Sequence, residues 1–93
     1  MKVFCLVNKA NGLLFIDAIS HTKTEKECLA WHRKIAKTKL SHPFYADFVE
    51  FGVDKFEALV LESSVEPEQI MSVVQSWITL LGTNVPELGY NVI

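Results

Sequence analysis

The sequence is poor in cysteine, glycine and proline, and it has no long hydrophobic run. The 93 residues include two cysteines, four glycines and three prolines, all scattered along the chain. Since no Cys-x-x-Cys pair is present, nothing indicates a zinc site or a redox dithiol, and Cys5 and Cys28 are predicted to be reduced core residues. Since no glycine-rich loop is present, phosphate cradles of the P-loop and dinucleotide-binding types are excluded.

Metal-binding and membrane-targeting patterns are also missing. His21, His32 and His42 stand ten or more residues apart with no His-x-x-x-His pair, so we expect exposed histidines and no metal site. No apolar run is long enough to cross a membrane, and the first residues lack the layout of a signal peptide. We therefore expect a soluble, cytoplasmic protein without a membrane partner or a cofactor.

The length, composition and charge of the chain indicate its domain organisation and its possible partners. At 93 residues and 49% hydrophobic, the chain suits one domain, residues 1–93, and its apolar surplus is compatible with a homodimer or a patch for a protein partner. The charges divide unevenly, because residues 1–50 carry a net +3 and residues 51–93 a net −5. An overall acidic chain is a poor non-specific nucleic-acid binder, although a local basic face can still dock on an anionic surface.

The hydrophobic pattern predicts an α+β fold of order ββααβα, with a small three-stranded antiparallel sheet flanked by three helices. Residues 2–8 and 13–19 are apolar on both alternating faces, which predicts a hairpin covered on both sides. Thr24 and Glu27 form a capping box for a first helix reaching about Lys39, and Pro43 begins a second one. Residues 55–62 form the third strand, with Leu59 near the core. The third helix opens at residues 63–67 and ends at Gly82.

Several stretches carry a resemblance to a known family, in matching order and spacing. They are Lys2–Asn8, the turn Asn11–Gly12 with Leu13–Asp17, then Phe51–Glu62, and finally Gly89–Asn91. Together they resemble the GIY-YIG nuclease superfamily over essentially the whole chain. The resemblance implies the same α+β arrangement, and it suggests a phage or mobile-element protein because the family is common there.

The same resemblance implies a degenerate member without catalytic residues. The family cuts DNA with a Tyr in each hairpin motif, a Gly after the second, an Arg on the first helix and a metal-binding Glu on the third. The corresponding positions are Phe4, Phe15, Asp17, Ala30 and Val74. The hydroxyls, the cation and the carboxylate that phosphodiester cleavage requires are therefore replaced. Asp17 as a metal ligand and Arg33 as a substitute cation are the alternatives.

An acid-free basic run follows along the first predicted helix and its exit. It consists of His32, Arg33, Lys34, Lys37 and Lys39. The run is either an ordinary solvated helix face or a docking edge beside the former active-site groove. Trp31 and Tyr45 are close in sequence and would add aromatic contacts to such an edge.

Three functional hypotheses follow. The first is a non-catalytic binding protein, a small phage or mobile-element accessory protein that binds and blocks or redirects a host protein or nucleic-acid enzyme. The second is a nucleotide-binding sponge, in which a vacated pocket between Phe4, Phe15 and the first helix stacks a base while Arg33 or Lys34 holds phosphate. The third is a residual metal-dependent DNA endonuclease.

Overall fold

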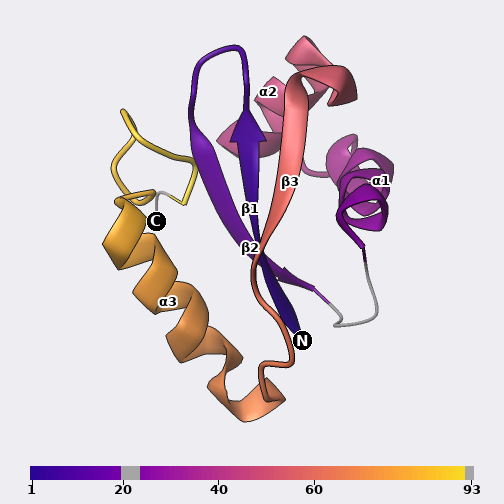
Figure 1. Ribbon diagram of the computed structural model, residues 1–93. Coiled ribbons are helices and arrows are strands. Elements are labelled where there is room, and N and C mark those ends of the chain that lie inside the picture. Colours follow the sequence, from indigo (N-terminus) through magenta and orange to yellow (C-terminus); the bar gives the residue numbers. More distant parts are fainter. Residues whose placement is uncertain (20–23, 92–93) are drawn as a thin grey trace.

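The computed structural model describes residues 1–19 and 24–91 (Figure 1). Its strands are β1 (Lys2–Asn8), β2 (Leu14–Ile19) and β3 (Phe56–Glu62), and its helices are α1 (Glu25–Ala36), α2 (Pro43–Phe51) and α3 (Ile70–Leu81). Short 3₁₀ turns precede β3 at Val53–Lys55 and α3 at Pro67–Gln69. The sheet is antiparallel with order β2-β1-β3, so the predicted ββααβα fold is confirmed. None of the described helices combines the length and apolarity needed to cross a membrane.

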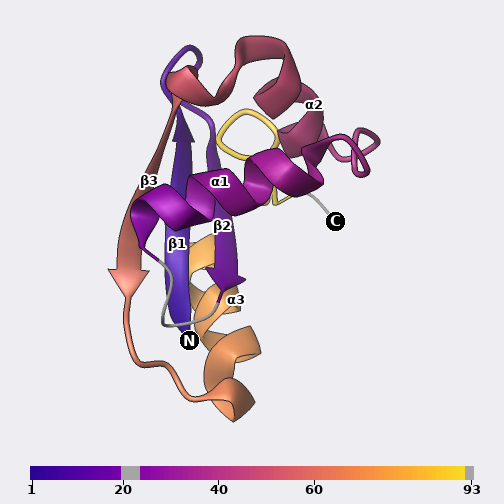
Figure 2. The ribbon, with the colours of Figure 1, turned by 90° about the vertical axis from the view of Figure 1, so that its right-hand side faces the viewer.

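The sheet is covered on both faces, as the strand pattern predicted. Figures 1 and 2 show α1 and α2 on one face and α3 on the other. Phe4, Leu6 and Phe15 point from the sheet into the core beneath α1 and α2, whereas Val3, Cys5 and Ile16 point toward α3. This alternation follows from the period of two in a strand, and it fixes which face each later residue of the sheet occupies.

The helix ends depend on local capping. The predicted capping box is confirmed, because the Thr24 side chain accepts a hydrogen bond from Glu27 N–H while the Glu27 carboxylate accepts one from Thr24 N–H. α1 ends at Ala36, shorter than predicted. His42 caps α2 by accepting the Phe44 N–H at Nδ1, at 3.1 Å. Helix α3 begins only at Ile70, because the predicted opening around Pro67 forms a 3₁₀ turn instead.

The outer edge of β2 is closed by the chain itself. The segment after α3 lies beside β2 (Figure 1), where Leu14 N–H donates to Leu88 O at 3.1 Å and Tyr90 N–H donates to Leu14 O at 2.8 Å. Farther along, the Asn91 amide accepts the Ile16 N–H at 2.7 Å and donates to Ile16 O at 2.9 Å. The Ala18 N–H donates to the Asp17 carboxylate at 2.9 Å. The outward N–H groups of β2 are therefore all occupied.

Residue Gly89 allows this close approach. A Cβ atom at position 89 would lie 2.6 Å from Leu14 O and 2.6 Å from the Cα of Thr83. Both distances are well inside van der Waals contact, so only glycine lets the segment reach the strand.

The opposite edge of the sheet, β3, is less covered. Leu59 was predicted near the core, but 45% of it is exposed. The reason is that α3 packs mainly against β2, and it leaves the α3 face of β3 partly open (Figure 1).

Candidate functional site

The two hairpin aromatics lie in the core. Phe4 is fully buried and Phe15 is 8% exposed. The ring of Phe15 stacks on Phe44 of α2, with centroids 4.3 Å apart and planes 19° from parallel. The predicted base-stacking pocket between Phe4, Phe15 and α1 is therefore wrong, because aromatic side chains of the protein fill that space.

A buried polar group lies beside these rings. His32 of α1 is fully buried, and its Nδ1 is 2.9 Å from the Tyr45 hydroxyl of α2. Its Nε2 is 3.2 Å from Asp17 Oδ2, within ion-pair range but not aligned as a hydrogen bond. Burial, followed by the nearby Asp17 and Cys28, raises the pKa of Tyr45 far above its usual value. The phenol therefore stays neutral and can donate to Nδ1.

This group corrects two predicted binding residues. His32 and Tyr45 were predicted on an exposed basic or aromatic edge, but the structure buries both. The error for His32 has a clear source, since it lies four residues after Cys28 and four before Ala36, on the buried stripe of α1. Cys28 is also buried, and burial raises its pKa to about 12, so it is a thiol and not a nucleophile.

Asp17 and Val74 share a small cavity at the edge of β2. The cavity measures about 300 Å³, and its walls come from β2 and α3. Its lining residues are Asp17, Ala18, Ile70, Met71, Val74 and Gln75. Two of the five positions implied by the family resemblance are thus close in space. Among the described residues that line the cavity, Asp17 is the one with a charged side chain.

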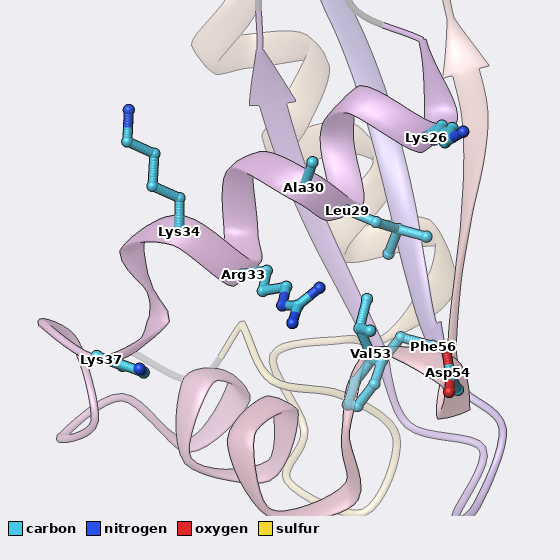
Figure 3. A pocket seen from close by; sticks show the side chains of 9 residues that line it. All are labelled: Lys26, Leu29, Ala30, Arg33, Lys34, Lys37, Val53, Asp54 and Phe56. Carbon is cyan, nitrogen blue, oxygen red and sulfur yellow. The ribbon is translucent and has the colours of Figure 1, made fainter.

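A basic groove lies between α1 and the start of β3, shown in Figure 3. We use "basic groove" for this surface of about 790 Å³. It is lined by Lys26, Leu29, Ala30, Arg33, Lys34 and Lys37 of α1 and its cap, and by Val53, Asp54 and Phe56. Leu29, Val53 and Phe56 provide an apolar floor, and the cationic side chains lie along its α1 side. Figure 3 shows Arg33 pointing toward Val53 and Lys34 pointing away from the floor. Such a combination suits an anionic ligand that also has apolar parts.

The basic groove continues toward α2. A second hollow of about 330 Å³ shares Arg33, Lys37, Val53 and Asp54 with it and adds Ala36, Phe48, Val49 and Gly52. Figure 3 shows the Leu29 side chain pointing from α1 toward β3, and Lys26 near the end of α1 closest to that strand. The groove therefore runs along α1 from α2 to the β3 side of the sheet.

The structure brings together only part of the predicted basic run. Arg33, Lys34 and Lys37 line the basic groove, and Ala30 lies among them. Lys39 is exposed beyond α1 but is not part of the lining, and Trp31 is 41% exposed yet also lies outside it.

Sequence reasoning missed Lys26 and Asp54. Helical spacing offered a signal for Lys26, because it precedes Leu29, Ala30 and Arg33 by three, four and seven residues. No local signal exists for Asp54, which reaches the groove through the 3₁₀ turn before β3.

The described part of the chain contains no group of three or more His, Cys, Asp and Glu side chains placed to hold a metal ion. His42, which caps α2, has its pKa lowered by burial and then by Lys39, while Asp17 acts in the opposite direction. A neutral imidazole fits its role as the acceptor of the Phe44 N–H.

Comparison with known proteins gives one informative match. No protein-family model matches the chain, and no curated protein matches it. Among solved structures, the chain is similar to the catalytic domain of homing endonuclease I-TevI, with a TM-score of 0.74 and 19% sequence identity. The match covers 100% of this chain and 99% of that domain.

The chain has a GIY-YIG fold. At 19% identity the likeness concerns the fold, and it accounts for the shared element order and sheet topology. Within this GIY-YIG fold, Phe4 and Phe15 lie in the core under α1 and α2, Asp17 and Val74 meet at the β2 edge, and the basic groove lies between α1 and the start of β3.

Proposed function

We propose that this protein is a non-catalytic binding protein on a GIY-YIG scaffold, and that the basic groove is its binding surface. The observation that carries the proposal is the row of Lys26, Arg33, Lys34 and Lys37 along one side of an apolar floor. We propose an acidic protein segment as the ligand. The corresponding role is a cytoplasmic phage or mobile-element accessory protein that blocks or redirects a host protein or a nucleic-acid enzyme.

We also propose that the protein has no catalytic activity, and the side chains at positions 4, 15 and 74 support this. A phenylalanine ring at positions 4 and 15 has no ionisable group, and both rings are packed in the core. Val74 contributes a hydrocarbon wall to the cavity that it shares with Asp17. A hard divalent ion prefers several oxygen ligands, and this cavity supplies one carboxylate. Water activation and charge neutralisation at a phosphate would therefore lack their usual groups.

An acidic protein segment fits the groove better than duplex DNA does. The chain has a net charge of −2, which opposes the long-range approach of a polyanion. Phosphate neutralisation also makes no use of an apolar floor, whereas the side chains of a protein segment would cover the exposed parts of Leu29 and Val53. A nucleotide is the second candidate, because a volume of about 790 Å³ is in the range of small-molecule pockets.

A direct binding assay tests the groove. Fluorescent probes would be an acidic peptide of Glu and Leu, a duplex DNA and ATP, each titrated with the protein at low and at physiological salt. The variant Lys34→Glu/Lys37→Glu reverses charge in the groove. The matched control Lys9→Glu/Lys39→Glu makes the same charge change at exposed positions outside the lining.

We expect the peptide to bind, the groove variant to weaken it about tenfold or more, and the control to change it little. Equal effects of the two variants would place binding elsewhere.

Incubation of plasmid DNA with protein and Mg²⁺ or Mn²⁺ tests whether the protein is catalytic. Metal-dependent nicking that disappears in Asp17→Ala would overturn the non-catalytic proposal.

A further inference from the structure

The two edges of the sheet differ in their hydrogen bonding. At the β2 edge, the outward backbone groups of Leu14 and Ile16 are paired with the segment Leu88–Asn91. At the β3 edge, the direction of the backbone follows from the pairing with β1. Lys9 N–H donates to Lys55 O at 2.8 Å, and Val7 lies opposite Glu57 and Cys5 opposite Leu59. Because bonding alternates along an antiparallel pair, Ala58 and Val60 direct their N–H and C=O groups away from β1.

These outward groups of β3 are unoccupied. Within residues 1–19 and 24–91, no hydrogen-bond partner exists for the outward backbone groups of Ala58 and Val60. Four backbone groups in a row form a template for another strand. The strand carries no proline and no lysine, two of the residues that commonly prevent edge pairing.

The two faces of β3 carry opposite charge. On the α1 face, Phe56 contributes to the floor of the basic groove, and Lys26 and Arg33 stand over the same side of the sheet. On the α3 face, Glu57 and Glu62 are exposed beside Leu59. Glu62 also accepts the Trp77 indole N–H at 2.8 Å, which places it on that face. A strand added at this edge would therefore meet cations on one face and carboxylates on the other.

We propose that the ligand of the basic groove binds as an extended segment that adds to the β3 edge, with acidic side chains on the α1 face and basic side chains alternating with them on the α3 face. The inference rests on the proposed function, and it adds the mode of binding and the sequence pattern of the partner. Backbone hydrogen bonds at Ala58 and Val60 supply affinity, and the alternating charges supply specificity.

The charges argue against a second copy of this chain as the occupant. In a symmetric pairing of β3 with itself, the α1 face would receive Phe56, Ala58 and Val60, none of which carries charge. The same pairing would bring the Glu57 and Glu62 side chains of both copies to one face. The basic groove would remain unneutralised, and the carboxylates would gather together.

Peptides test the mode of binding. The first probe is a capped peptide matched in length to β3 in which Glu and Lys alternate. The second has the same composition with all Glu residues before all Lys residues, so net charge is conserved and only the pattern changes. Two further versions of the alternating peptide carry N-methyl groups, one on every Glu nitrogen and one on every Lys nitrogen. Binding is followed by fluorescence anisotropy and by amide exchange of the protein.

We expect the alternating peptide to bind about tenfold or more tightly than the block peptide. One N-methylated version should lose binding and the other should keep it. In an antiparallel addition, the peptide residues on the face of Ala58, which are the Glu residues, direct their N–H groups to β3, so methylation of Glu prevents binding. In a parallel addition, the residues on the opposite face, which are the Lys residues, direct their N–H groups to β3, so methylation of Lys prevents binding. The amides of Ala58 and Val60 should exchange rapidly in the free protein and slowly in the complex, whereas those of Leu14 and Ile16 are protected in both.

The outcomes separate this inference from the proposed function. Equal binding of the alternating and block peptides, or equal effects of both methylated versions, would overturn strand addition. If Lys34→Glu/Lys37→Glu still weakened those peptides, the groove function would stand without it. Concentration-dependent protection of Ala58 and Val60 in the protein alone would identify a second copy as the occupant and would also overturn the inference. Ala58→Pro, which removes one outward N–H, is a further variant, and the methylated peptides give the answer even if it fails to fold.

Discussion

Replacing Gly89 by alanine should loosen the closure of the β2 edge. The added Cβ would lie 2.6 Å from Leu14 O and from the Cα and Cβ atoms of Thr83, and two of these three neighbours are backbone atoms. Backbone on both sides cannot move aside as the tip of a flexible side chain does. The segment that carries residue 89 must therefore shift by about 1 Å away from the strand to restore ordinary contact distances.

The size of the effect follows from the hydrogen bonds that this shift stretches. Tyr90 N–H to Leu14 O is 2.8 Å and Leu14 N–H to Leu88 O is 3.1 Å, so both would exceed bonding distance. The two bonds between the Asn91 amide and Ile16 depend on the same segment. Two to four lost bonds at about 1 kcal/mol each predict a loss of about 2–4 kcal/mol in the free energy of unfolding.

Urea denaturation followed by tryptophan fluorescence would measure this loss. The control is Gly12→Ala, since Gly12 has φ +79° and open space where its Cβ would stand. The control therefore carries only the cost of a left-handed backbone, about 1–2 kcal/mol. If Gly89→Ala destabilised the protein no more than Gly12→Ala, the argument from close approach would be refuted.

Three other substitutions test the interior and the helix cap. Tyr45→Phe leaves Nδ1 of buried His32 without its hydroxyl partner, so urea denaturation should show a loss of about 1–3 kcal/mol, and an unchanged midpoint would contradict the hydrogen bond. Phe15→Tyr places a hydroxyl inside a packed core, so we expect destabilisation of about 1–3 kcal/mol without metal-dependent plasmid nicking; nicking by this variant would contradict the expectation. The pKa of His42 in the folded protein is lowered from 6.5, so as the pH falls, His42 becomes protonated in the unfolded chain before it does in the folded protein. The stability that is present above pH 6.5 is therefore lost as the pH falls toward the folded pKa. His42→Asn keeps a capping residue without a titrating group, so the difference in melting temperature between pH 7.5 and 5.5 should be smaller than in the unaltered protein, and an equal difference would contradict this role.

Much of the fold could be predicted because its signals are local. Alternating apolar residues in β1 and β2, the capping box of Thr24 and Glu27, and Pro43 at the first turn of α2 each act over a few residues. The elements that sequence reasoning misplaced depend on tertiary contacts. The exposure of Leu59, for example, depends on where α3 lies across the sheet, which the pattern of β3 itself does not state.

The candidate site was predicted only in part, for the same reason. Arg33, Lys34 and Lys37 share a charged face that helical spacing reveals, and they line the groove. His32 stands next to them in sequence, but it points inward because Asp17 and Tyr45 provide polar contacts under α1. Those partners come from β2 and α2. The available signal was the position of His32 on the apolar stripe of α1. A polar side chain at such a position indicates a buried hydrogen bond more than a surface ligand.

The closure of β2 by residues 88–91 also has a consequence for biogenesis. During synthesis the three strands leave the ribosome before this segment does, so the nascent sheet would for a time offer unpaired backbone on both sides. The same holds for a chain interrupted by a premature stop codon after α3. Such a product would keep its hydrophobic core and its helices. It would nevertheless expose two unpaired edge strands to neighbouring chains, and it would tend to aggregate or be degraded.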